Sequence, residues 1–485
     1  MFILFFWEIK NHKETIDISS IRTNSVSIID YGVQGDGKTD DTIRFQQAIN
    51  DSVQKDQFLI IPKGTYVVSP LKYRDSNSSD WWCLDIPSSA KLYFEPGAII
   101  KLVDNAPEWT RVLVMSEVEN VSLYGHVQVD GNAQTVTNGN EHMHGIFIFD
   151  SRNIHIESAH SYNSYGDNLF IGGTEENYSE NINISFFKGV TAGRKNLVIH
   201  YVDNLHIGTA VLDNSKGGVG NQWSGENSLD LEPDAFRGIN EFYQRIDNLS
   251  TYGMGNDFTV GREKNLAKQW KLDIGTFNVE LMEGATEGLL SYAVTIEIDK
   301  LYVKSHKNND DIGLKMVYAA LWKIEEATFM EGNNYAISAK ESDGQKPDLK
   351  IEKVTILRPN GGGLELWGAN AEVEELEVTT KGTVLDVFST STHRVKVNNF
   401  LSIDSGEDEI IYISDYGYEP HIQINELQVI DEREHKVNRI VYLNTQNAVD
   451  GLEVNQLQNK QNLRKVGYGE SVLRKDSPFL KEINQ

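Results

Sequence analysis

The stretch HMHGIFIFDSRNIHIESAHSYNSYGDNLFIGG (142–173) alternates apolar residues with polar or aromatic ones in three short segments. These segments are GIFIF (145–149), NIHIES (153–158) and NLFIGG (168–173). Alternation with a period of two residues indicates β-strands. Glycine, asparagine and serine separate the segments, so this stretch predicts short strands joined by tight corners.

The same pattern recurs along the chain as a series of equivalent apolar pairs. The pairs are Ile146/Ile148, Leu169/Ile171, Leu197/Ile199, Leu229/Leu231 and Phe258/Val260. Successive pairs are 23, 28, 32 and 29 residues apart. Repeats of this length are typical of a solenoid, whereas the blades of a β-propeller are longer, about 40–50 residues each. We therefore predict an all-β fold, a right-handed single-stranded parallel β-helix.

Asparagine precedes many of the predicted strands. It tolerates left-handed backbone angles, which favours a tight corner at each of these positions. The residues are Asn153, Asn168, Asn181, Asn196 and Asn204.

An acidic, glycine-rich loop, DYGVQGDGKTDDT (30–42), precedes the segment TIRFQQAIN (42–50), which reads as a short helix. Its expected apolar stripe is Ile43, Phe45, Ala48 and Ile49. The carboxylates of this loop could bind a cation, or Asp40 or Asp41 could cap the helix.

Composition excludes some functions. The chain of 485 residues has 45 basic and 71 acidic residues, a net charge of −26, which argues against a nucleic-acid partner. Cys83 is the single cysteine, so no internal disulfide can form. The N-terminal MFILFFWEIK (1–10) is too short to span a bilayer and has no basic residue before its apolar run. We expect a strand or clasp there, with no membrane insertion and no standard signal peptide.

Roughly the first half of the chain resembles, by its motifs, the pectate-lyase-like β-helix superfamily, which includes bacteriophage tailspikes and polysaccharide depolymerases, and the rest resembles it by architecture. The resemblance is carried by DYGVQGDGKTDDT (30–42), IIPKGTY (60–66), EPGAII (95–100) and GHVQVDGN (125–132). It implies that the helix caps the solenoid core and that the acidic loop is structural. It also implies a polysaccharide partner, an extracellular or virion-tail location, and a homotrimer, with a single-chain enzyme as the alternative. The GDD, GHG and RIK motifs of polygalacturonases are absent, which puts pectin in doubt as the substrate.

We expect five regions along the chain. They are an N-terminal arm (1–25), a cap with the first coils (26–132), central coils that carry a groove (133–265), C-terminal coils (266–462) and a C-terminal cap or tail (463–485).

Alignment of the coils on their apolar pairs predicts a row of outward-facing side chains. Asp230 and Glu232 are two residues apart on one strand, about 6.6 Å along the backbone. That distance is near the lower end of the roughly 6.5–9.5 Å carboxyl separation of inverting glycosidases. Asp167 precedes its strand by two residues and could join them from the groove edge. We therefore predict Asp230, Glu232 and Asp167 as catalytic residues, although an acidic pair on a strand can also be a solvated face.

Other residues near this row are predicted to bind substrate, through stacking of aromatic rings on sugar faces or through charge. They are His200, Arg194, Phe170, Phe147, His144 and Trp223. His142 and His144 are two apart, but a zinc site would need further ligands. We therefore expect no metal and no cofactor, with Ca²⁺ only if the protein is a lyase.

Three functions remain open from the sequence. The first is hydrolysis of a surface polysaccharide by paired carboxylates. The second is a polysaccharide lyase that uses the same groove, with Arg194 as the base. The third is a non-catalytic, glycan-binding tail fibre. One fold hosts many activities, so the scaffold alone does not choose between them.

Overall fold

The fold is taken from a computed structural model that describes residues 24–73, 80–214, 228–232, 242–259, 270–292, 294–318, 320–358, 360–391, 393–406, 409–415, 418, 421–433, 439–444, 452–459 and 466–468. Trp223, nearly all of the predicted N-terminal arm and most of the predicted C-terminal tail lie outside the described residues.

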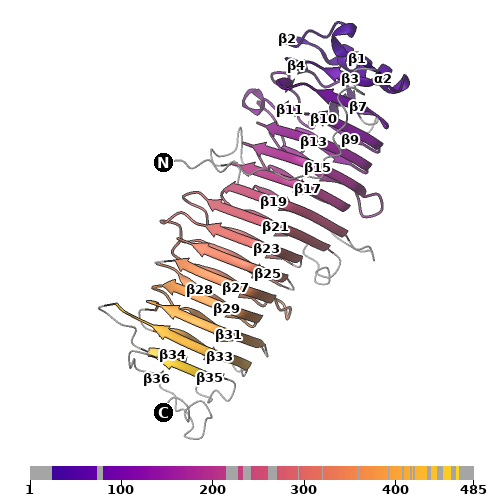
Figure 1. The fold of residues 1–485 in the computed structure, drawn as a ribbon. Helices are drawn as coiled ribbons and strands as arrows, with labels where there is room; N and C mark the ends of the chain where they lie inside the picture. Colours follow the sequence, from indigo (N-terminus) through magenta and orange to yellow (C-terminus); the bar gives the residue numbers. More distant parts are fainter. Residues whose placement is uncertain are drawn as a thin grey trace.

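The chain forms a parallel β-solenoid with two long sheets, and the predicted fold class is confirmed. Figure 1 shows the coils stacked along one axis from the N-terminal to the C-terminal end. Neighbouring strands in both sheets pair in parallel, and β5 with β6 is the antiparallel exception among the described pairings.

The first sheet, called sheet A here, has 20 strands. They are β1 (Ser25–Ser27), β2 (Asp36–Asp40), β3 (Phe58–Ile61), β4 (Gly64–Val68), β7 (Lys91–Phe94), β8 (Ala98–Leu102), β10 (Glu119–Gly125), β11 (Val127–Asp130), β13 (Arg152–Tyr162), β15 (Ser179–Val190), β17 (Val202–Asp213), β19 (Phe242–Gly253), β21 (Trp270–Leu281), β23 (Thr295–Lys304), β25 (Leu321–Met330), β27 (Asp348–Arg358), β29 (Asn370–Thr380), β31 (Arg394–Ile403), β33 (His421–Ile430) and β35 (Leu452–Asn459).

The second sheet, called sheet B, has 16 strands. They are β5 (Lys72–Tyr73), β6 (Trp81–Asp85), β9 (Thr110–Ser116), β12 (Ile146–Phe149), β14 (Leu169–Gly172), β16 (Leu197–Ile199), β18 (Leu229–Leu231), β20 (Asn256–Thr259), β22 (Glu287–Tyr292), β24 (Ile312–Val317), β26 (Tyr335–Lys340), β28 (Gly362–Trp367), β30 (Leu385–Ser389), β32 (Glu409–Asp415), β34 (Arg439–Asn444) and β36 (Val466–Tyr468).

Apolar side chains stack in columns inside the solenoid. Ile146, Leu169, Leu197 and Leu229 lie directly opposite one another in successive strands of sheet B, and all four are buried. Burying a side chain of this size contributes about 1.5–3 kcal/mol. Burial of this column therefore fixes the register of these four strands.

One predicted pair is out of register by two residues. Phe258 lies opposite Leu231, whereas the spacing of apolar pairs placed it opposite Leu229. The residue opposite Leu229 is thus Asn256, whose side-chain oxygen accepts a hydrogen bond from the Leu229 N–H at 3.3 Å.

The N-terminal end is capped by the helix α2 (Thr42–Gln54), with the 3-10 helices η1 (Ile28–Tyr31) before it and η2 (Ala133–Thr135) further along. Phe45, Ala48 and Ile49 are buried as predicted. The prediction for Ile43 is wrong, because its side chain is 71% exposed. The helix continues beyond the predicted residue 50, and Ser52 completes its buried face.

The acidic loop is held by hydrogen bonds to its own backbone. The Asp41 carboxylate accepts the N–H groups of Gln34 and Gly35 at 2.7 and 2.9 Å. Asp40 accepts the Thr42 N–H at 3.0 Å, at the start of the helix. The loop carboxylates therefore stabilise the turn and the helix terminus.

Asparagines occupy two different kinds of position. Asn153, Asn181 and Asn204 adopt the predicted left-handed backbone angles, with φ of 53°, 56° and 50°, but they lie near the starts of β13, β15 and β17 and not at corners before these strands. Asn168 and Asn196 do not adopt such angles. They are buried, and the Asn168 amide donates to the Asn196 side-chain oxygen at 2.6 Å.

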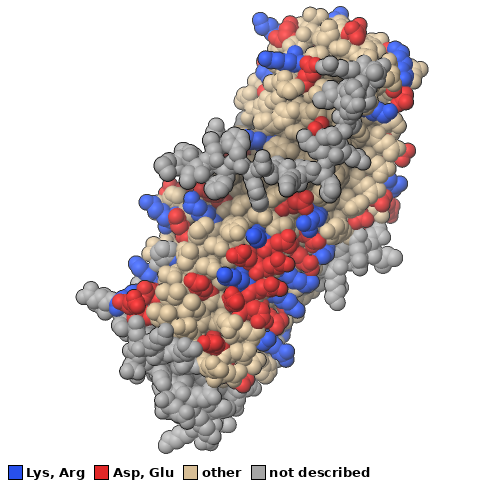
Figure 2. Space-filling view, in the orientation of Figure 1, with Lys and Arg blue, Asp and Glu red and all other residues tan. Residues whose placement is uncertain are grey.

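The outer face of sheet A mixes acidic and basic side chains, which Figure 2 shows over the C-terminal coils. Many of these charges are paired across neighbouring strands, for example Lys323 with Glu297 at 2.6 Å and Lys304 with Glu280 at 3.2 Å. Such exposed pairs contribute little stability each, about 0–1 kcal/mol. No helix in the described part of the chain has the length and apolar character needed to cross a bilayer.

Candidate active site

The candidate site lies on the outer face of sheet B, where one column of side chains runs across four strands. Phe147, Phe170, Val198 and Asp230 lie opposite one another in β12, β14, β16 and β18. Because side chains alternate along a strand, this column faces away from the core formed by the flanking leucines and isoleucines. The predicted aromatic-to-acidic row is therefore present.

His200 and Glu232 continue the same face just beyond the ends of β16 and β18. The His200 N–H donates to the Ile171 carbonyl at 2.8 Å, and the Glu232 N–H donates to the Ile199 carbonyl at 3.0 Å. The rings of His200 and Phe170 are 5.8 Å apart. Ladder hydrogen bonds thus hold both residues beside the preceding coil.

A stack of rings forms the N-terminal side of the site. His144, Phe147 and Phe170 contact one another, with ring centroids 5.4 Å apart for His144–Phe147, 5.1 Å for His144–Phe170 and 5.3 Å for Phe147–Phe170. The Arg111 guanidinium lies 3.9 Å from the Phe147 ring centre. Phe147 and His144 are buried, so neither ring has a face open to a sugar, whereas Phe170 and His200 are partly exposed. Phe147 and His144 therefore pack beneath the exposed surface of the site and would not contact a bound sugar directly.

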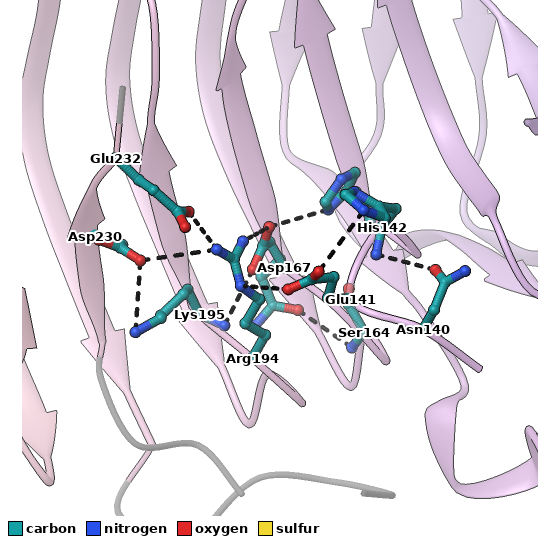
Figure 3. Close-up of polar contacts among 11 residues, drawn as sticks. Asn140, Glu141, His142, Ser164, Asp167, Arg194, Lys195, Asp230 and Glu232 are labelled. Atoms are coloured by element: carbon teal, nitrogen blue, oxygen red, sulfur yellow. Dashed lines mark hydrogen bonds and ion pairs between the residues drawn. The ribbon is translucent and has the colours of Figure 1, made fainter. Parts of the chain in front are cut away.

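Arg194 is the centre of the polar cluster in Figure 3. Its Nη1 lies 3.1 Å from Asp167, its Nε lies 3.5 Å from Glu141, and its Nη2 forms an ion pair with Glu232. The same Nη2 lies 3.9 Å from Asp230. Burial alone would lower the pKa of Arg194, but the surrounding carboxylates raise it well above its ordinary value. Arg194 is therefore a fixed cation.

The corner between β15 and β16 places Arg194 in this position. The Arg194 N–H donates to the Gly166 carbonyl at 3.0 Å, and the Gly193 N–H donates to the Ser164 carbonyl at 2.8 Å. The buried Asn168–Asn196 pair anchors the strand that follows. The corner is thus fixed by backbone hydrogen bonds to the preceding coil.

Asp167 lies beneath Arg194 and is fully buried. It accepts the Lys195 N–H at 3.2 Å, and its other oxygen lies 3.1 Å from His144 Nδ1. Burial raises the pKa of Asp167, but the charge of Arg194 and the contact with His144 outweigh it, and the net pKa is below the ordinary value. Burial lowers the pKa of His144 to about 4. At neutral pH Asp167 is therefore an ionised support, and His144 is neutral.

Lys195 completes the cluster from the same corner, with its Nζ 3.5 Å from Asp230. The sequence analysis did not select Lys195 or Glu141 as site residues. Lys195 directly follows the selected Arg194, and Glu141 lies three residues before the selected His144, so the charged residues next to the predicted ones were a signal for both.

No group of three or more histidine, cysteine, aspartate or glutamate side chains in the described ranges is arranged to hold a metal ion. His142 stacks on Trp109, with ring centroids 4.5 Å apart and planes 11° from parallel. Burial lowers the pKa of His142. Its packing accounts for this residue without a metal.

The sequence resemblance is confirmed by comparison with known proteins. The family model described as rhamnogalacturonase A/epimerase, pectate lyase-like, matches residues 25–74. The uncharacterized protein YclG of Bacillus subtilis (strain 168) is 25% identical over 222 residues, which is 42% of this chain and 37% of that protein. This chain thus matches well under two thirds of the relative's length.

Solved structures with a similar course of the chain include phage proteins and an enzyme. The pre-mature gene product 12 of bacteriophage phi29 is 12% identical, with a TM-score of 0.44 over 91% of this chain and 73% of that one. A mutant tailspike of E. coli bacteriophage HK620 in complex with a hexasaccharide is 10% identical, with a TM-score of 0.43 over 93% and 81%. An exopolygalacturonase of Thermotoga maritima is 10% identical, with a TM-score of 0.36 over 83% and 95%.

The N-terminal signature and the stacked parallel coils agree with one another. Residues 25–74 are similar to the pectate-lyase-like family model, and the described coils form a parallel β-solenoid.

Proposed function

We propose that this protein depolymerises an extracellular or cell-surface polysaccharide by hydrolysing glycosidic bonds with Asp230 and Glu232. The observation that carries the proposal is the convergence of these two carboxylates on Arg194 at the outer face of sheet B. The match of residues 25–74 to a glycan-processing family model supports the substrate class.

The two carboxyl groups are close enough to act on one bond. Each has an oxygen within 4 Å of the same Arg194 Nη2, so the facing oxygens are less than about 8 Å apart. Glycosidases that retain configuration place their carboxyls about 5–5.5 Å apart, and those that invert it about 6.5–9.5 Å apart. One carboxyl would protonate the leaving oxygen, and the other would activate water or attack the sugar. The anomer of the first product would distinguish these two courses.

The remaining charged residues position the pair. Glu232 is 37% exposed and can reach a bound sugar, whereas Asp230 lies deeper, between Arg194 and Lys195. Asp167 is buried under Arg194 and holds the guanidinium in place. We therefore assign Asp167 a positioning role and not the catalytic role that its sequence position first suggested.

The lyase alternative needs an arginine that gives up its proton. The carboxylates around Arg194 raise its pKa, so the protonated form is favoured further. This favours hydrolysis over β-elimination with Arg194 as the base.

A non-catalytic glycan-binding fibre is the second candidate. It is favoured by the engagement of Arg194 with Asp167, Glu141 and Glu232, which leaves those acids in ion pairs. A fibre would bind the glycan without shortening it, so the two functions give different products.

The test is a panel of bacterial capsular polysaccharides, teichoic acids and plant glycans, scored for loss of chain length. Asp230→Asn and Glu232→Gln should each reduce the cleavage rate about 10²–10⁴-fold and retain binding. Asp247→Asn and Glu180→Gln make the same changes at half-exposed acids of sheet A and should leave the rate unchanged. Full cleavage by both site variants would refute the assignment.

Two further expectations follow from the same proposal. A polymer of this kind lies outside the cell, so the protein would act there or on a virion tail. The homotrimer implied by the resemblance can be checked by light scattering of the purified chain.

A further inference from the structure

The described residues of the site carry more acid than base. The carboxylates of Glu141, Asp167, Asp230 and Glu232 surround one guanidinium. Lys195 contributes the second positive charge. Four acids against two bases leave two formal negative charges in this part of the site.

The histidines and the arginine next to the cluster do not offset this excess of negative charge. Burial lowers the pKa of both His142 and His144, so these imidazoles are neutral at pH 7. Arg111, a described cation beside His144, is matched by Asp80 at 2.5 Å. The excess negative charge therefore stands within the described residues.

Arg194 is also poorly placed to bind an anion from outside. Its side chain is only 14% exposed, and its three nitrogens face Asp167, Glu141 and Glu232. An incoming carboxylate would have to displace one of these partners. Lys195 lies equally deep and faces Asp230.

We infer that the sugar ring bound across Asp230 and Glu232 is uncharged, so that the substrate is a neutral glycan and not a uronate polymer at the bond that is cleaved. This rests on the proposed function and names its substrate class. A carboxylate about 8 Å from even one excess negative charge near a protein surface is disfavoured on the order of tenfold in binding constant. The sequence predicts that Arg194 binds substrate through its charge, and its ion pairs argue against that role.

The test uses matched polymer pairs that differ in charge alone. Each uronate-containing capsular polysaccharide, with polygalacturonate beside them, is compared with its carboxyl-reduced derivative, which keeps the linkage and loses the charge. The reduced member should be cleaved with at least tenfold higher kcat/KM. Equal or faster cleavage of the native uronate polymer would overturn the inference.

A binding measurement separates this inference from the proposed function. The wild type, which keeps all four carboxylates of the site, is titrated with hexasaccharides of both members of each pair. If neither member is cleaved by the wild type, hydrolysis fails, but tighter binding of the neutral hexasaccharide still supports the inference. Equal or tighter binding of the anionic one, or no binding of any neutral one, overturns it.

A charge variant gives an independent check. Glu141 is 40% exposed at the edge of the cluster, so Glu141→Gln removes one negative charge without removing Asp230 or Glu232. It should strengthen binding of anionic hexasaccharides about three- to tenfold relative to neutral ones. Glu180→Gln, at a glutamate of similar exposure in sheet A, should leave that ratio unchanged. An unchanged ratio in Glu141→Gln would contradict the charge argument.

Discussion

Replacement of Arg194 by methionine should destabilise the central coils, because it leaves the Asp167 carboxylate buried without its cation. Breaking a buried ion pair by removing one partner costs about 3–5 kcal/mol. Asp167 can limit the cost by taking up a proton. From an ordinary pKa of 3.8, protonation at pH 7 costs about 4 kcal/mol at 1.36 kcal/mol per unit. We therefore expect a loss of about 3–4 kcal/mol.

The assay is urea unfolding of four proteins at pH 7: the wild type, Arg194→Met, Asp167→Asn and the double variant. In the double variant the buried group is a neutral amide, so the double variant should be more stable than Arg194→Met by about 2 kcal/mol. The midpoints are compared at equal slopes, because a long solenoid can unfold in more than one step.

The free energies of unfolding of the wild type and Arg194→Met should depend on pH in opposite directions. In the wild type the pKa of Asp167 is lowered, so its stabilisation is present above pH 3.8 and is lost as the pH falls through the folded value. In Arg194→Met the pKa should be raised, so stability should be lost as the pH rises. The gap between the two proteins should therefore shrink between pH 7 and pH 4.5. A constant gap, or a double variant no more stable than Arg194→Met, would refute this reasoning.

Three other predictions concern the C-terminal coils, the buried amides and metal dependence. Burial raises the pKa of Asp386 to about 7, so stability should fall by about 2–4 kcal/mol between pH 4 and pH 7.5, and Asp386→Asn should remove this slope in thermal unfolding. Asn196→Ala leaves the Asn168 and Asn214 amides without a shared partner and should cost about 2–4 kcal/mol in urea unfolding, so a loss under 0.5 kcal/mol would contradict it. EDTA should leave polysaccharide cleavage unchanged, whereas loss of cleavage together with products that absorb in the ultraviolet would indicate a lyase.

The fold could be predicted from the sequence because a β-helix repeats one simple constraint. Each short strand points alternate residues into the core, so pairs such as Leu197/Ile199 reveal both the strand and the face that it turns to the core. The slip at Phe258 shows the limit. A search for apolar pairs selects Phe258 and Val260 as the inner residues of this strand. The inner position opposite Leu229 is instead taken by Asn256, and such a search does not find a polar residue there.

The candidate site could be predicted only in part. Strand periodicity placed Phe170 and Asp230 on one face, because a strand fixes the direction of every side chain. In the corners between strands, side-chain directions do not follow from the sequence spacing. Arg194 and Lys195 are adjacent in the sequence, yet they face different carboxylates, and corner hydrogen bonds set their directions.

The sequence also did not predict which of the outward-facing side chains are buried. The ring of Phe147 faces outward from the solenoid core and is nevertheless buried, because His144, Arg111 and Phe170 pack on it. An outward position on a strand therefore does not mean exposure to a ligand.

The in-register columns of sheet B have a consequence for how such a molecule can change in size. Successive core residues Leu314, Ile337, Leu364, Leu385 and Ile411 are 23, 27, 21 and 26 residues apart, yet each lies opposite the next. Differences in chain length are absorbed at the turns, while the wall repeats at about 4.8 Å per layer. A complete layer could thus be gained or lost far from Asp230 without shifting it. The solenoid can therefore change in length by whole coils while the geometry of the candidate site stays the same.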